Sequence, residues 1–143
     1  MSTYSIYEVA NFFRNKASMP PEKLQILCYY AEAWSHALLN KGMVNDTTFE
    51  AWEQGPVSPE LDRDFRWAFI PKRDSEGMVD EEDKALLESV WVTYGDLSAN
   101  ELAVITRQED PWKIARMGLD KHSNNVIHSK DMADFYGNIY IGD

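Results

Sequence analysis

One stretch of seventeen residues, KLQILCYYAEAWSHALL from Lys23 to Leu39, most constrains what this chain can fold into. It has no glycine or proline, and at about 100° per residue the polar side chains Gln25, Glu32 and His36 fall on one line, with Tyr29 beside them. Nearly every other position is apolar, whereas a surface helix carries an apolar stripe on a polar body. We therefore expect a central helix wrapped by other helices, because the stretch is too short and too polar to span a membrane.

The composition favours one soluble domain over residues 1–143, since hydrophobic residues make up 44% of the chain and suffice for one packed core. Fourteen basic against 24 acidic residues leave a formal charge of −10, which argues against a nucleic-acid partner and suits a basic protein partner. The N-terminus, MSTYSIYEVANFF, has no signal-peptide pattern, and the one cysteine, Cys28, excludes an internal disulfide framework. We expect a cytoplasmic protein.

Helix signals recur along the rest of the chain. Ser5 followed by Glu8 is a capping box and predicts a helix from Ile6 to Lys16, and Gly42 is expected to close the central helix. Further helix starts, each with a polar cap or an early proline before an apolar repeat, are Ser58-Pro59, Asp80, Ser98, Asp110-Pro111 and Ser129. The buried side of the helix after Ser58 is predicted to consist of Leu61, Phe65, Ala68 and Phe69.

The segment between the central helix and Ser58 has a different character. Thr47, Thr48, Phe49 and Trp52 favour extended structure, and Gly55-Pro56 is a turn signal. The sequence thus predicts a mainly α fold, in which six or seven short helices pack around one central apolar helix and a small β-hairpin-like element follows that helix.

Motifs for catalysis or metal binding are missing from the sequence. The three histidines and the single cysteine form no metal-ligand spacing, and no GxSxG, GxGxxG or GxxxxGK is present, so we predict no metal, no cofactor and no enzyme. One group of side chains could still support catalysis. Tyr29, Glu32 and His36 on one edge of the central helix have the residue types of an acid–base group, although a polar seam that caps neighbouring backbone groups or faces water is the simpler interpretation.

Five tryptophans are many for this length, and aromatic side chains serve both cores and interfaces. We expect Trp34, Trp91 and Trp112 to fill the core. Trp52 and Trp67 flank the Gly-Pro turn and are the better candidates for exposure and for contact with a partner.

Three segments, taken together, resemble the Panacea domain, the SocA-like antitoxin family of bacteria, phages and prophages: LQILCYYAEAWSHAL, FEAWEQGPVSPEL and YGDLSANELAVITRQEDPW, in that order and spacing. The opening YSIYEVANFF is similar to the family's usual start, so the resemblance covers residues 4–112. Three departures predict a partner unlike the commonest ones. Arg107 stands where the family often has His in its T-H-x-E-x-P-W segment, Gln54 where an aromatic often precedes the Gly-Pro, and Ile26 where a Lys is usual.

The resemblance implies a mainly helical protein, encoded beside a toxin, that neutralises this toxin by direct binding. Some family members also deliver the toxin to a protease, so a protease is a second expected partner, and the resemblance brings no catalytic residue. Our candidate partner-binding residues are Trp52, Gln54, Gly55, Pro56, Trp67, Arg107 and Glu109. The acidic run Asp80–Asp83 is expected to attract a basic toxin surface.

Two alternatives stay open at the level of the sequence. A DNA-binding regulator with a winged-helix-like core is suggested by the order helix, β element, turn, helix, with Arg63, Arg66 and Lys72-Arg73 as a modest basic patch. The net charge argues against it. The other alternative is an enzyme that uses Tyr29, Glu32 and His36.

Overall fold

The computed structural model describes residues 3–66, 69–72, 79–120 and 124–142. These residues form seven helices and one hairpin, and the fold is mainly α as expected. The elements are α1 (Ile6–Lys16), α2 (Pro21–Leu38), β1 (Glu50–Trp52), β2 (Gly55–Val57), α3 (Pro59–Phe65), α4 (Glu81–Tyr94), α5 (Ala99–Arg107), α6 (Asp110–Arg116) and α7 (Ser129–Gly142).

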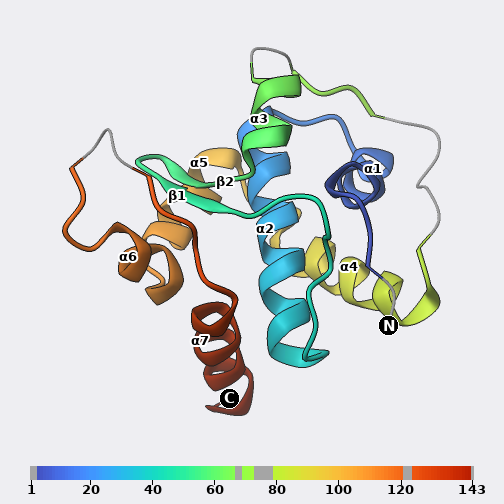
Figure 1. The fold of residues 1–143 in the computed structure, drawn as a ribbon. Helices are drawn as coiled ribbons and strands as arrows, with labels where there is room; N and C mark the ends of the chain where they lie inside the picture. The colour runs from blue at the N-terminus through green and yellow to red at the C-terminus, as the bar shows by residue number, and fades with distance from the viewer. Residues whose placement is uncertain (1–2, 67–68, 73–78, 121–123, 143) are drawn as a thin grey trace.

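The central element is α2, as the sequence predicts. Helices α1, α4, α5 and α7 all pack against it, and α7 runs beside its C-terminal half (Figure 1). Its residues from Leu24 to Ala31 are all buried, including Cys28, whose thiol has its pKa raised by burial. An apolar helix enclosed in this way explains why its polar positions must find partners inside the fold.

The predicted helix starts are confirmed where the caps are local. Ser5 with Glu8 and Ser98 with Glu101 form the two reciprocal capping boxes, and the Ser58 hydroxyl accepts a hydrogen bond from the N–H of Leu61 at 3.4 Å. Each of these hydroxyls satisfies an N–H group that the first turn of a helix leaves without a partner.

Two predictions about helix ends are wrong. The left-handed residue that follows α2 is Asn40 (φ 55°), not Gly42, because the short polar side chain of Asn tolerates this conformation. Phe69 does not lie on the buried side of α3: it is 63% exposed, since α3 ends at Phe65 and the helical repeat stops there. Ala68 lies outside the described residues.

The two strands of the hairpin have different neighbours on the side that faces away from the hairpin. Residue pairs Glu50–Val57, Ala51–Pro56 and Trp52–Gly55 face each other, and on the far side of β1 the N–H of Ala51 donates to the carbonyl of Asn125 at 2.8 Å. Helix α6 holds the same strand, because the indole of Trp112 donates to the carbonyl of Trp52 (2.9 Å) and Arg116 donates to that of Ala51 (3.0 Å). The outer strand is therefore β2, and it faces α2 and α5 (Figure 1).

Candidate functional site

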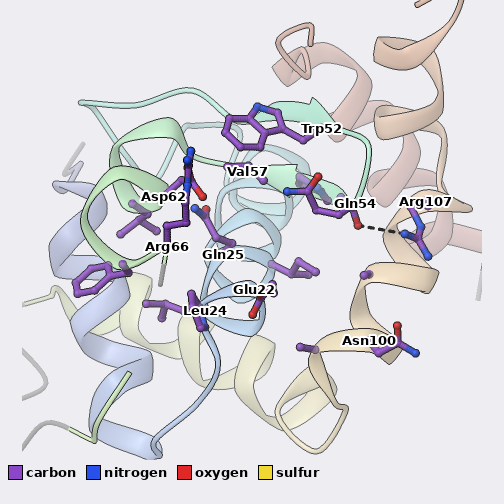
Figure 2. A pocket seen from close by; sticks show the side chains of 18 residues that line it. Glu22, Leu24, Gln25, Trp52, Gln54, Val57, Asp62, Arg66, Asn100 and Arg107 are labelled. Atoms are coloured by element: carbon purple, nitrogen blue, oxygen red, sulfur yellow. Dashed lines mark hydrogen bonds and ion pairs between the residues drawn. The ribbon is translucent and has the colours of Figure 1, made fainter. Parts of the chain in front are cut away.

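A pocket of about 670 Å³ lies between the N-terminal half of α2, the hairpin, α3 and α5 (Figure 2). Its apolar lining includes Leu24, Ile26, Trp52, Val57, Leu61 and Phe65. This size and lining are typical of sites that take apolar groups of a ligand or partner. Polar side chains from three elements stand among these residues and are considered in turn.

Gln25 is buried, and its side-chain amide is fully engaged with the main chain that follows β2. Its Oε1 accepts from the N–H of Ser58 at 2.8 Å, and its Nε2 donates to the carbonyl of Ser58 at 3.0 Å. The amide thus pairs with Ser58 as a neighbouring strand would and fixes the hairpin to α2.

Two arginines line the pocket, on different sides of Gln25 in Figure 2. Arg66 on α3 is ion-paired with Asp62, one turn earlier on the same helix. Arg107 at the end of α5 donates to the carbonyl of Gln54 at 3.4 Å, and within the described part of the chain no carboxylate forms an ion pair with it. Within the described residues the two cations therefore differ, because a carboxylate is paired with Arg66 and none is paired with Arg107.

The structure brings five of the seven predicted partner-binding residues to this one pocket: Trp52, Gln54, Gly55, Pro56 and Arg107. Trp67 lies outside the described residues. Other lining positions were not singled out in the sequence, among them Asn100 and Ala103. Their spacing with Arg107 on α5 places the three on one helical face, a signal that the sequence does carry.

Glu109, the seventh residue, lies elsewhere and is half-buried. Its Oε1 accepts hydrogen bonds from the hydroxyls of Tyr30 and Tyr136, each at 2.8 Å. Since the proton of Tyr136 is used in this way, Tyr29 donates to Tyr136 across 3.0 Å. Burial raises the pKa of the Glu109 carboxyl, while the two tyrosine hydrogen bonds act against this rise. The arrangement joins α2, α7 and the start of α6 around one carboxyl group.

Comparison with known protein families decides where the chain belongs. The family described as "Antitoxin SocA-like, Panacea domain" matches residues 24–113. The chain belongs to this family. Searches of curated proteins and of solved structures returned no match. The matched segment runs from α2 into α6 and contains every residue that lines the pocket except Pro21 and Glu22, so the pocket is made by the family domain itself.

In this antitoxin-like chain, Glu32 and His36 act as a cap. Glu32 Oε1 accepts from the N–H groups of Met43 (2.6 Å) and Val44 (3.1 Å), and its Oε2 lies 3.2 Å from Nε2 of His36. Tyr29 does not join them, because its hydroxyl is directed to Tyr136. The side chains therefore fix the loop after α2, which matches the simpler of the two sequence interpretations.

The acidic run at the start of α4 is divided between the surface and the interior. Asp80, Glu81 and Glu82 are exposed, but Asp83 is only 2% exposed and its Oδ1 lies 2.9 Å from Nζ of Lys41. Its Oδ2 accepts from the hydroxyl of Tyr4 at 2.7 Å. Three carboxylates of the run, not four, are thus exposed to solvent.

The remaining alternatives receive little support from the described residues. Of the predicted basic patch, Arg63 is paired with Asp64 and Arg66 with Asp62, so their charges are balanced locally. Lys72 is exposed, and Arg73 lies outside the described residues. In the parts of the chain that are described, no three His, Cys, Asp or Glu side chains are grouped to hold a metal ion. The helices of these same parts are all too short or too polar to cross a membrane.

Proposed function

We propose that this chain is an antitoxin that neutralises a toxin encoded beside it, in the cytoplasm, by direct binding at the pocket between α2, the hairpin, α3 and α5. The observation that carries the proposal is the family match, because it covers the elements that build this pocket. Binding alone would suffice for neutralisation if the bound toxin segment belongs to its active surface or holds that surface inactive.

The pocket is suited to protein binding in two respects. Trp52 and Phe65 give it aromatic walls, and aromatic anchors dominate the energy of protein interfaces. The hairpin that forms one wall is fixed on the side away from the pocket, because Trp112 and Arg116 of α6 donate hydrogen bonds to carbonyls of β1. A wall that is fixed before binding loses little conformational entropy when the partner arrives.

The experiment that tests the proposal fills the pocket without changing charge. Ala103 lines it from α5, and the Ala103→Leu variant places extra methyl groups into the cavity. Ala85→Leu, on the exposed face of α4 and outside the pocket lining, is the matched control. Each variant is expressed with the product of the neighbouring reading frame, and growth rescue and co-purification are scored.

We expect wild type and Ala85→Leu to rescue growth and to form a complex, and Ala103→Leu to do neither at unchanged thermal stability. Rescue and complex formation by Ala103→Leu would exclude the pocket. A neighbour that is harmless when expressed alone would remove the antitoxin role for this pair. Delivery to a protease is tested in the same cells, because it predicts a toxin half-life that shortens only when the antitoxin is present.

A further inference from the structure

We propose that the pocket takes a helical segment of the toxin, whose apolar side chains enter the cavity while an Asp or Glu of the same helix pairs with Arg107. This rests on the proposed function and specifies the chemistry of the partner. Two observations carry it: the outer edge of the hairpin offers few main-chain groups for pairing, and among the described residues no carboxylate pairs with Arg107.

The outer edge of β2 offers few main-chain groups to an added strand. Because the N–H of Ala51 points away from β2, its partner Pro56 directs its main chain outward, and proline has no N–H to donate. Ser58, two residues on, has both main-chain groups taken by Gln25, and the carbonyl of Gln54, two residues before, accepts from Arg107. At these three outward positions, the hydrogen bonds of the described residues leave the carbonyl of Pro56 and the N–H of Gln54 for a partner strand.

A partner at this site must therefore satisfy its own main-chain groups. An extended peptide would lose its hydration at the apolar lining and gain few ladder hydrogen bonds in return, which is costly. A helix makes these hydrogen bonds internally and presents apolar side chains at helical spacing to a groove. The small side chain of Ala103 on α5 leaves room for such a helix between the hairpin and α3.

Arg107 sets the polar contact. Among the described residues its side chain donates to the carbonyl of Gln54, a long contact at 3.4 Å, and a guanidinium has five N–H donors. The other donors can form a bidentate pair with a carboxylate. Asn100 lies on the same face of α5 and lines the pocket, so it offers a further amide to the partner's polar side. The overall charge of −10 acts at longer range and does not oppose a local pair at this guanidinium.

The test uses a display library of random peptides of about 16 residues, or roughly four helical turns. The C-termini are fused to the carrier, so only side-chain carboxylates are offered. Binders are selected on the wild-type full chain and depleted on Ala103→Leu. We expect enriched sequences to repeat apolar residues at i, i+3, i+4 and i+7 and to include an Asp or Glu. Circular dichroism should show that the selected peptide gains helix on binding.

The affinity of the selected peptide for three variants completes the test. Arg107→Gln should weaken binding roughly tenfold or more, as loss of a charge-assisted hydrogen bond predicts, and Arg107→Lys should restore part of it. Lys113→Gln, an equal charge change at an exposed position of α6, should have no effect. The same four proteins are then assayed for toxin neutralisation.

The outcomes separate this inference from the proposed function. No enrichment, enriched sequences without an acidic residue, or equal affinity of Arg107→Gln and wild type would overturn the helix-and-carboxylate chemistry. If neutralisation nevertheless persists and Ala103→Leu abolishes it, the antitoxin role at the pocket stands without this chemistry. If the peptide binds as expected and the neighbouring product is harmless, the recognition chemistry stands and the antitoxin role for that pair does not.

Discussion

The side-chain amide of Gln25 on α2 forms hydrogen bonds to both main-chain groups of Ser58, at 2.8 and 3.0 Å. This one contact joins the central helix to the end of the hairpin and to the start of α3. Gln25 is only 7% exposed, so water cannot replace it without a structural change. It also occupies the main-chain positions at which a partner strand would otherwise bind.

Replacement of Gln25 by Ala should lower the free energy of unfolding by about 1–3 kcal/mol, because it leaves the buried N–H of Ser58 without its acceptor. The carbonyl of Ser58 loses one of its donors but still accepts from the N–H of Asp62 at 3.0 Å. Urea denaturation followed by circular dichroism measures this loss. Gln108→Ala is the control, since Gln108 is exposed at the end of α5, and it should change stability by less than about 0.5 kcal/mol. Equal stability of the two variants would show that the Ser58 groups find other partners.

Gly55 should resist substitution because of its backbone and not for lack of space. Its φ is +152°, which L-residues rarely adopt, yet an added Cβ would meet Thr106 Oγ1 at 3.6 Å and Ile26 Cδ1 at 3.9 Å, ordinary contact distances. Gly55→Ala should cost about 1–3 kcal/mol in thermal or urea unfolding. Gly137→Ala in α7, where a Cβ meets nothing within 4 Å, should instead stabilise by about 0.5–1 kcal/mol. Two effects of the same sign would contradict this assignment.

The parts of the fold that the sequence predicts well are those decided by near neighbours. A cap such as Ser98 with Glu101 spans three positions, and the apolar composition of α2 requires burial whatever surrounds it. The end of α3 was missed because the pattern up to Phe69 is helical. In the structure α3 ends at Phe65, and the sequence around this residue carries no signal for a helix end.

The site is predictable only in part, for the same reason. The Gly-Pro turn and its aromatic neighbour point to the hairpin wall, and the resemblance points to Arg107. The partners of Gln25 and Glu109 lie 33 and 79 positions away, in Ser58 and Tyr30, and such pairs arise only when the helices pack. From the sequence alone, such a polar residue could contact a partner or form hydrogen bonds inside the fold. Its burial in the structure decides between these two roles.

Asp83 should be one of the most sensitive positions for stability. It holds Lys41 and Tyr4 in the interior and so joins the N-terminal segment, the loop after α2 and the start of α4. Asp83→Ala should lower the unfolding free energy by about 3–5 kcal/mol, because it removes the buried carboxylate that pairs with the ammonium of Lys41. Glu82→Ala, on the exposed side of the same turn, should change it by less than about 0.5 kcal/mol.

A double variant separates the charge from the packing at this site. Lys41→Met with Asp83→Leu removes both charges and keeps apolar volume, so it should recover much of the stability lost in Asp83→Ala. No recovery would mean that the hydrogen bond from Tyr4 to Asp83, and not the ion pair, supplies the stabilisation. Thermal unfolding of wild type, Asp83→Ala, Glu82→Ala and the double variant, all at one protein concentration, gives the comparison.

Glu109 should make stability depend on pH in the direction opposite to that of most carboxylates. Burial raises its pKa above the usual 4.5, so the folded chain favours the protonated form. Its contribution to the unfolding free energy is therefore complete below the ordinary carboxyl range and is lost as pH rises through the raised pKa. The facing hydroxyls stay neutral throughout this window, since burial also raises the pKa values of Tyr30 and Tyr136.

Glu109→Gln keeps an oxygen that can accept from both tyrosines and removes the titration. The stability of this variant relative to wild type should therefore increase from acidic to neutral pH in a series of urea titrations. Glu101→Gln gives the opposite sign, because the Ser98 N–H lowers the pKa of Glu101 and favours its ionised form in the folded chain. Its stability relative to wild type should decrease over the same titration. A curve for Glu109→Gln that falls in parallel with that of Glu101→Gln would show that the folded chain favours the ionised Glu109 carboxylate, and it would overturn the assigned direction.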